Sequence, residues 1–203
     1  MPRNNSRDTK EEILSASLKF FSEKGYDGVG VRDIANEIGI RESALYKHFN
    51  SKKNIFDGIL KDIERRYQEE SAAFFPLNED DAKEELFRIS LAMFQFYLKA
   101  EYGSQLRKML TIEQYRNSEA GEFFRELIIN QGLEQISGVF TALIKDEVYV
   151  EDDPMIMALQ FYSSLYLLLC KYDNQPDKYE DAVTLLKRHI TQFNKNYLRR
   201  DTH

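Results

Sequence analysis

Side chains able to contact nucleic acid gather between positions 41 and 52, just after Gly39. Lysine and arginine bind phosphate oxygens, serine and carboxylate groups bind base edges, and an alanine methyl group contacts thymine. The residues concerned are Arg41, Glu42, Ser43, Ala44, Tyr46, Lys47, His48 and Lys52. Their types and spacing predict a surface that reads base edges and holds phosphates.

Motifs for catalysis or metal binding are absent from the sequence. None of the histidines, His48, His189 and His203, has a glutamate three residues before it, as a di-iron helical bundle requires. There is no P-loop and no Gly-x-Ser-x-Gly nucleophile motif. The single cysteine, Cys170, cannot form an internal disulfide or a cysteine zinc site, which fits a reducing compartment. We therefore expect no enzyme activity, no metal and no other cofactor.

Two short helices and a tight turn are expected to position the polar surface. Apolar residues recur at helical spacing over residues 31–38 and again over 42–49. Gly39 lies between them, at a sharp turn where a side chain would cost strain. The pattern is typical of a helix-turn-helix, whose second helix is narrow enough to enter a major groove. A helical hairpin that only packs is the alternative.

A longer run of residues resembles one known family. The run reads Phe20-x4-Gly25-Tyr26, then Val31-x-x-Ile34-Ala35-x-x-x-Gly39-Ile40, then Leu45-Tyr46-x-His48-Phe49-x-Ser51-Lys52. It resembles the N-terminal domain of the tetracycline-repressor (TetR) family of bacterial transcription regulators over about residues 9–58. The resemblance implies a homodimer that places its third helices in successive major grooves of a palindromic DNA operator. It also implies that a small ligand in the C-terminal body releases the DNA.

Individual roles follow from the resemblance, each beside a plainer alternative. Arg32 resembles a family position that contacts the DNA backbone, and Arg41, Glu42, Ser43 and Ala44 match positions that touch base edges. Glu42 either accepts a hydrogen bond from a cytosine amino group or caps the helix. Phosphate contacts are expected from Tyr46, Lys47, His48 and Lys52. The alternatives are solvated charge for the two lysines and neutral packing for His48.

The rest of the chain predicts an all-α fold of about nine helices. A first helix should end at Gly25, and long helices should follow the helix-turn-helix. Their expected ranges are 52–73, 82–99, 104–115, 119–145, 154–172 and 177–199, with Gly103 as a break. We expect a DNA-binding domain over 1–51, a connector helix over 52–75, and a ligand-binding and dimerisation domain over 76–203.

Aromatic and methionine side chains in the C-terminal body suit a cavity for an apolar or aromatic ligand. Such residues at helical spacing also form ordinary core, which is the alternative. The candidate lining residues are Met93, Phe96, Tyr97, Met109, Tyr115, Phe124, Phe140 and Tyr162.

The last two helices, over about residues 154–199, predict a homodimer interface. Residues 155–170 are apolar almost all round, and residues 179–197 carry an apolar stripe. Two such helices meeting their twins would form a four-helix interface. The alternative is that both are ordinary core, and a purely structural helical adaptor is the rival to a regulator.

Charge is unevenly divided along the 203 residues, whose net charge is -6. Residues 1–61 hold 11 basic and 9 acidic residues, a net of +2, and the remainder carries -8. The first 20 residues are too polar for a signal peptide, and the 17-residue apolar run from Pro154 to Cys170 is short of a membrane span. We expect a cytoplasmic protein with no membrane partner, whose acidic body helps orient a weakly basic head.

Overall fold

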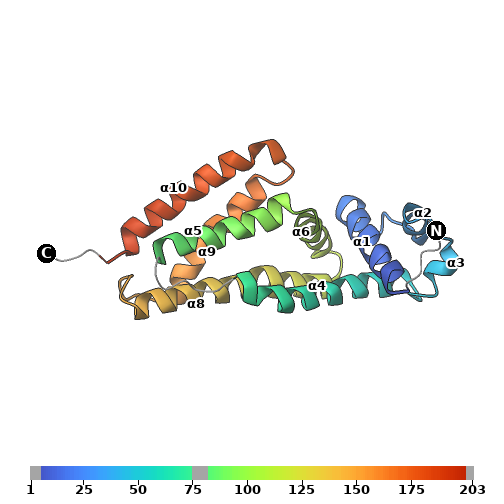
Figure 1. Cartoon of the computed structure of the whole chain (residues 1–203), viewed down its shortest axis with the longest axis horizontal. Helices are drawn as coiled ribbons and strands as arrows, with labels where there is room; N and C mark the ends of the chain where they lie inside the picture. Colours follow the sequence, from blue (N-terminus) through green and yellow to red (C-terminus); the bar gives the residue numbers. More distant parts are fainter. Residues whose placement is uncertain (1–5, 75–81, 200–203) are drawn as a thin grey trace. The chain divides into compact units, whose positions relative to one another are not determined.

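The computed structural model describes residues 6–74 and 82–199, and these are almost entirely helical (Figure 1). Within these residues, extended pairing is limited to one isolated antiparallel bridge between Tyr149 and Leu198. Counting Ser118–Lys145 as one helix gives nine helices in the described residues, so the all-α prediction is confirmed. That helix is long and apolar enough to cross a membrane by length and composition alone, a test that soluble core helices also pass.

The described residues form two compact units. The first takes residues up to Ser71 together with Gln105–Phe124, and the second takes Ala72–Ser104 together with the chain from Arg125 onward. The predicted functional division at residues 52 and 76 stays a prediction.

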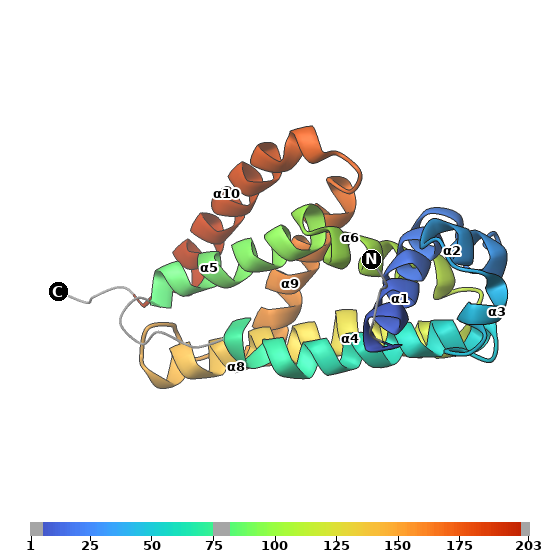
Figure 2. The same ribbon diagram turned by 45° about the vertical axis from the view of Figure 1, so that its right-hand side comes forward.

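The first unit holds the helix-turn-helix and two later helical segments (Figure 2). Its elements are α1 (Ser6–Lys24), α2 (Val31–Glu37), α3 (Glu42–Leu45), most of α4 (Lys52–Phe74), the larger part of α6 (Glu101–Glu113) and α7 (Ser118–Phe124). Gly39 turns the chain between α2 and α3 with a φ of +69°, in the region that favours glycine. Ser51 caps α4, because its Oγ accepts the Asn54 N–H at 3.1 Å.

The predicted second helix of the motif is shorter than expected. α3 ends at Leu45, and residues 46–48 continue as a tighter turn in which Lys47 N donates to Ala44 O and His48 N to Leu45 O. Bonds of this i→i−3 kind are common where a helix ends. The buried anchors Leu45 and Phe49 are as predicted.

The second unit is a packed set of longer helices. Its core joins aromatic and aliphatic side chains from α5, α8, α9 and α10. The elements are α5 (Ala82–Phe94), the π-helical segments η2 (Gln95–Lys99) and η3 (Arg125–Asn130), α8 (Gln131–Lys145), α9 (Pro154–Lys171), the 3₁₀ turn η4 (Pro176–Lys178) and α10 (Tyr179–Tyr197).

One expectation for this part of the chain was wrong. Gly103 does not break a helix but lies inside α6, where a Cβ would come within 2.3 Å of the Phe96 carbonyl oxygen. Its role is therefore close backbone approach. In the apolar stripe of α10, Leu186, Ile190 and Phe193 are buried in the core of their own unit, and the dimer interface over about 154–199 stays a prediction.

Candidate nucleic-acid interface

The predicted DNA-reading residues form an exposed surface around α3. Arg41, Glu42, Ser43 and Lys47 are exposed, and the Tyr46 side chain is 45% exposed. Ala44 and His48 are half-buried. Leu45, fully buried at the centre of this surface, fixes the short helix to the unit's core. The arrangement holds polar groups outward on a rigid base, as contact with a DNA groove requires.

The first turns of α2 and α3 differ in how they are capped. Asp33 accepts the Gly30 N–H at 2.9 Å, which satisfies one free amide at the start of α2 and leaves Arg32 exposed. Arg41 is the N-cap residue of α3, and its side chain makes no cap hydrogen bond. Glu42 therefore lies in the first turn of α3, where its charge suits the helix dipole.

The Lys52 side chain is hydrogen-bonded to the loop between α1 and α2. Its Nζ donates to the carbonyl oxygens of Tyr26, at 2.8 Å, and Val29, at 2.9 Å. The same ammonium lies 4.2 Å from the centre of the Tyr26 ring. Two of its three N–H donors are thus used within the protein, a structural role that sequence reasoning did not foresee.

Glu113, which sequence reasoning missed, holds the same loop from the other side. Its Oε1 accepts the backbone N–H of Tyr26 at 2.8 Å, and the residue is only 2% exposed. Gly25 makes this approach possible: its φ is +71°, and a Cβ there would lie 3.1 Å from that oxygen and 3.3 Å from Arg116 Nη1. We call the contacts of Tyr26 with Lys52 and Glu113 the loop clasp. The two ends of the Tyr26–Glu113 bond are 87 residues apart, so no local motif announces it.

The ring of Tyr26 completes the clasp. It packs against Phe21 and Phe56, each with a centroid distance of 5.5 Å. Burial raises the pKa of Tyr26, and the neighbouring carboxylates of Asp27 and Asp57 raise it further. The phenol therefore stays neutral at physiological pH.

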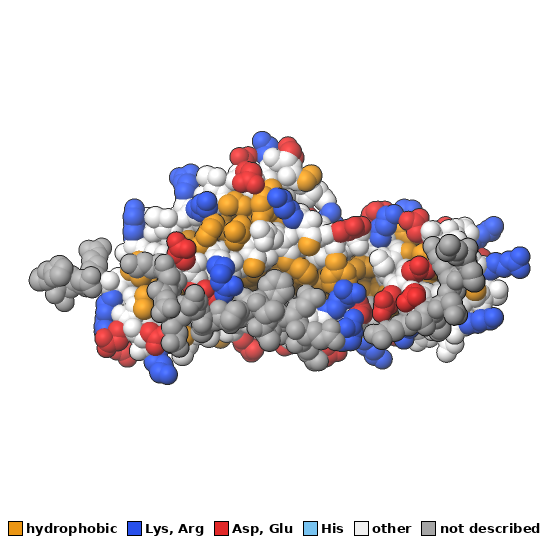
Figure 3. All heavy atoms as spheres, viewed as in Figure 1, with side chains coloured by type: hydrophobic (Ala, Val, Ile, Leu, Met, Phe, Trp, Pro, Cys, Tyr) orange, Lys and Arg blue, Asp and Glu red, His pale blue; other side chains and the backbone are white. Residues whose placement is uncertain are grey.

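Among the described residues, basic groups at the reading end are few. Figure 3 shows lysine and arginine side chains on the surface near α2 and α3, with acidic side chains among them. Several cations of the unit are already paired: Lys19 with Glu37 at 2.7 Å, and Lys53 with Asp57 at 2.8 Å. Arg32, Arg41 and Lys47 are exposed cations on α2, at the N-cap of α3 and just after it.

The candidate ligand residues are divided between the two units. Met109, Tyr115 and Phe124 belong to the first unit, and the other five to the second. Tyr115 is 87% exposed, which does not suit the lining of an enclosed cavity. Phe140 is core, with ring centroids 5.9 Å from Tyr149 and 5.2 Å from Phe193.

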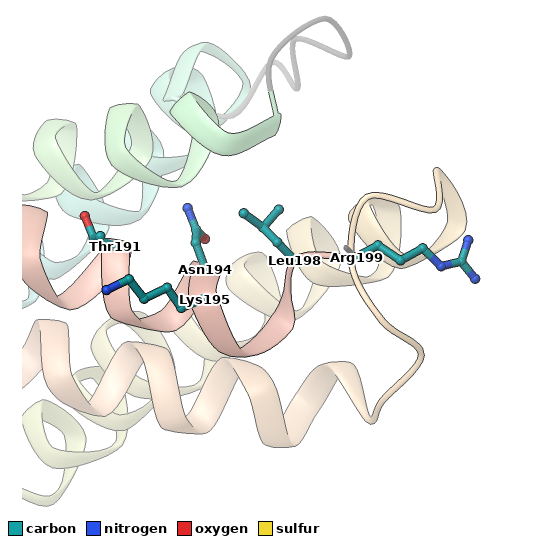
Figure 4. A pocket seen from close by; sticks show the side chains of 5 residues that line it. All are labelled: Thr191, Asn194, Lys195, Leu198 and Arg199. Atoms are coloured by element: carbon teal, nitrogen blue, oxygen red, sulfur yellow. The ribbon is translucent and has the colours of Figure 1, made fainter. Parts of the chain in front are cut away.

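Tyr162 also has a structural contact. Its hydroxyl donates to the carbonyl oxygen of Ile128 in the π-helical segment, and Gly132 leaves the room that its ring occupies. A surface hollow at the C-terminal end of α10 is lined by Thr191, Asn194, Lys195, Leu198 and Arg199, none of them a predicted ligand residue (Figure 4). The described residues hold no cluster of three or more metal-ligating side chains.

Comparison with known proteins agrees with the geometry of the first unit. Residues 13–59 match the model of the bacterial regulatory proteins of the tetR family. Over 52 residues the chain is 44% identical to the biofilm operon icaADBC HTH-type negative transcriptional regulator IcaR of Staphylococcus aureus (strain Newman). That alignment covers 26% of this chain and 28% of that protein.

Two further proteins match along most of the chain. The nucleoid occlusion factor SlmA of Aliivibrio fischeri (strain MJ11) is 27% identical over 190 residues, which cover 88% of this chain and 90% of that one. A solved protein of Saccharomonospora viridis, described as a transcriptional regulator and in complex with choline, superposes with a TM-score of 0.75 at 19% identity, over 96% and 100% of the two chains. This likeness shows a shared fold. The family comprises regulators rather than enzymes. Residues 13–59 therefore resemble the DNA-binding domain of the tetR family of bacterial regulatory proteins, and the chain as a whole shares the fold of the S. viridis protein.

Proposed function

We propose that this protein is a ligand-responsive transcriptional repressor that acts in the cytoplasm. It binds a palindromic DNA operator as a homodimer and leaves it when a small apolar or aromatic ligand binds the body. The observation that carries the proposal is the exposed polar surface of α3, anchored by the buried Leu45 within the matched residues 13–59. The relative IcaR is named a negative regulator, which supports repression.

The reading surface divides into base contacts and phosphate contacts. Arg41, Ser43 and Ala44 lie at the start of α3, the part of a recognition helix that meets base edges. Arg32, Tyr46, Lys47 and His48 surround it and bind phosphates. Glu42 either reads a cytosine amino group or only complements the helix dipole. Lys52 supports this surface through the loop clasp as well as by its charge.

The dimer forms through an uncovered apolar face of α9. Ile156, Leu159 and Leu167 are 48, 51 and 66% exposed, and Met155 is 43% exposed on the first turn. The opposite side of the same helix is buried in its own core. A second copy of the chain covers the exposed face, since a soluble protein rarely leaves a contiguous apolar stripe in water. α10 contributes polar contacts at the edge, because its exposed side includes Lys187, Arg188, Gln192 and Lys195.

Release follows from a shift between two states of the dimer. Both recognition helices bind only when their separation matches the DNA repeat of about 34 Å or a multiple of it. A ligand that prefers another separation, transmitted through the connector helix α4, weakens operator binding by its differential affinity for the two states. Choline in the S. viridis structure is a small cation that aromatic side chains can bind, so quaternary ammonium compounds belong in a ligand screen.

A selection from random DNA tests the proposed function. The purified full chain should enrich one palindrome, and the Tyr46→Ala variant should enrich it poorly. A second candidate is nucleoid occlusion, the role named for the relative that matches 88% of the chain. A few genomic sites at promoters favour repression, and many dispersed sites favour nucleoid occlusion. Enrichment of no sequence contradicts both.

Lys47 and Lys52 should respond differently to truncation. Lys47→Ala should lower affinity for all DNA and reduce the salt slope by about 0.9 without changing the free energy of unfolding. Lys52→Ala should in addition lower the free energy of unfolding by roughly 1.5–3 kcal/mol, because it removes two charge-assisted hydrogen bonds to carbonyls. Urea unfolding and DNA titration at several salt concentrations measure both effects. Equal stability of the two variants would argue against the loop clasp.

A further inference from the structure

The position of the Glu113 carboxylate is unfavourable for the stability of α6 itself. It is the last residue of α6, and a carboxylate at a helix C-terminus opposes the helix dipole. It is also 2% exposed, and burying a charge is expensive unless hydrogen bonds compensate. Helix stability therefore does not explain an acid here. The compensating contact is the Tyr26 N–H at 2.8 Å.

That contact fixes the loop that leads into the reading motif. Lys52 holds the Tyr26 carbonyl and Glu113 holds the Tyr26 amide, so the backbone is gripped on both sides of one residue. Lys52 also holds Val29, two residues before α2. The start of α2, and with it the α2–α3 pair, is thereby positioned by residues from α4 and α6.

α6 is a single continuous helix with residues in both compact units. Glu101–Ser104 group with the second unit, and Gln105–Glu113 group with the first. The Glu113 carboxylate lies at the end of α6 that belongs to the first unit, as do Tyr26 and Lys52. A hydrogen bond of 2.8 Å weakens steeply with small displacements.

We propose that Glu113 is a positioning residue for DNA reading. Its carboxylate sets the α1–α2 loop from the end of α6, and through that loop it sets the placement of the reading surface. This inference rests on the proposed function, since it names a contact that positions the DNA-reading surface. Glu113 itself does not touch DNA in this account.

The test compares Glu113→Gln with Glu113→Ala in the full chain. The glutamine oxygen can still accept the Tyr26 N–H, whereas alanine leaves that amide without its partner. Amide hydrogen exchange at Tyr26 should be about tenfold or more faster in Glu113→Ala than in the wild type, and close to the wild type in Glu113→Gln. Glu122→Ala, an exposed acid on α7, is the matched control for loss of charge.

Operator binding separates positioning from simple stability. The ratio of affinities for operator and random-sequence DNA should fall about tenfold in Glu113→Ala, recover in Glu113→Gln and stay unchanged in Glu122→Ala. A purely structural role would lower the melting temperature and leave this ratio intact in the folded fraction. Wild-type ratios in both Glu113 variants would overturn the inference while the proposed function stands. A wild-type protein that prefers no sequence would overturn the proposed function, and the inference with it.

Discussion

Replacing both Leu159 and Leu167 with glutamate should convert the protein to a monomer and lower its operator affinity by about 100-fold or more. Both side chains lie on the uncovered face of α9, where they are 51 and 66% exposed. Two negative charges there would meet their symmetry mates across a twofold axis. A monomer loses the effective concentration that links two half-site contacts, which is worth about 10²–10⁴ in affinity.

Sedimentation and DNA titration measure the two effects together. Val150→Glu, at another exposed apolar position in the body, is the matched control and should remain a dimer with full affinity. A double variant that stays dimeric would show that the interface lies elsewhere. One that becomes monomeric yet binds the operator as tightly as the wild type would refute the bivalent model.

Adding a methyl group at Gly25 should destabilise the head more than the same change at Gly39. Both glycines have positive φ, +71° and +69°, so alanine at either costs about 1–2 kcal/mol in backbone strain. At Gly39 no atom lies within 4 Å of the added Cβ, and strain is the whole effect. At Gly25 the methyl would also press on Glu113 Oε1 at 3.1 Å and Arg116 Nη1 at 3.3 Å, which disturbs the loop clasp.

Urea unfolding followed by a probe in the head measures this difference. Gly25→Ala should lose roughly 1 kcal/mol more than Gly39→Ala, as for other overpacked sites. Gly138→Ala is the control of opposite sign: it lies inside α8 with open space around it, and should gain about 0.5–1 kcal/mol. If Gly25→Ala lowers the free energy of unfolding no more than Gly39→Ala does, the close packing of the loop against α6 is not rigid.

Local pattern predicted the helix-turn-helix because its signals are local. The turn at Gly39, the buried Leu45 and the Ser51 cap each depend on residues within a few positions of one another. The length of α3 was overestimated because polar residues 46–48 continue the helical spacing while their backbone tightens into a turn. Helix boundaries of this kind depend on single hydrogen bonds that sequence does not display.

Contacts between distant segments were beyond reach of the sequence. The hydrogen bond from Tyr26 to Glu113 and the packing of the Tyr162 ring against Gly132 both depend on how the helices pack. An apolar stripe in a helix sequence likewise does not show whether it faces the protein's own core or a partner. The sequence of α10 shows a stripe, and only packing reveals that the stripe faces its own core while α9 keeps one apolar face uncovered.

The structure shows how several basic residues of the weakly charged DNA-binding head (residues 1–61) are used. Of its basic residues, Lys19 and Lys53 pair with acids and Lys52 holds the loop. The net charge of residues 1–61 is only +2, so non-specific binding should be modest. Specific binding must then depend on correct placement of the reading surfaces and on two heads acting together.

We propose that the α3 surfaces of two subunits together read one palindromic sequence. Changing the spacing between the half-sites of the operator tests this most directly. Titrations at about 150 mM salt should compare the selected palindrome, a shuffled sequence, and the palindrome with a half-turn of about five base pairs inserted between its half-sites. The account predicts at least about 1,000-fold tighter binding to the intact palindrome than to the shuffled sequence, and loss of most of that preference in the insertion. Equal affinity for the palindrome and the shuffled sequence would contradict it.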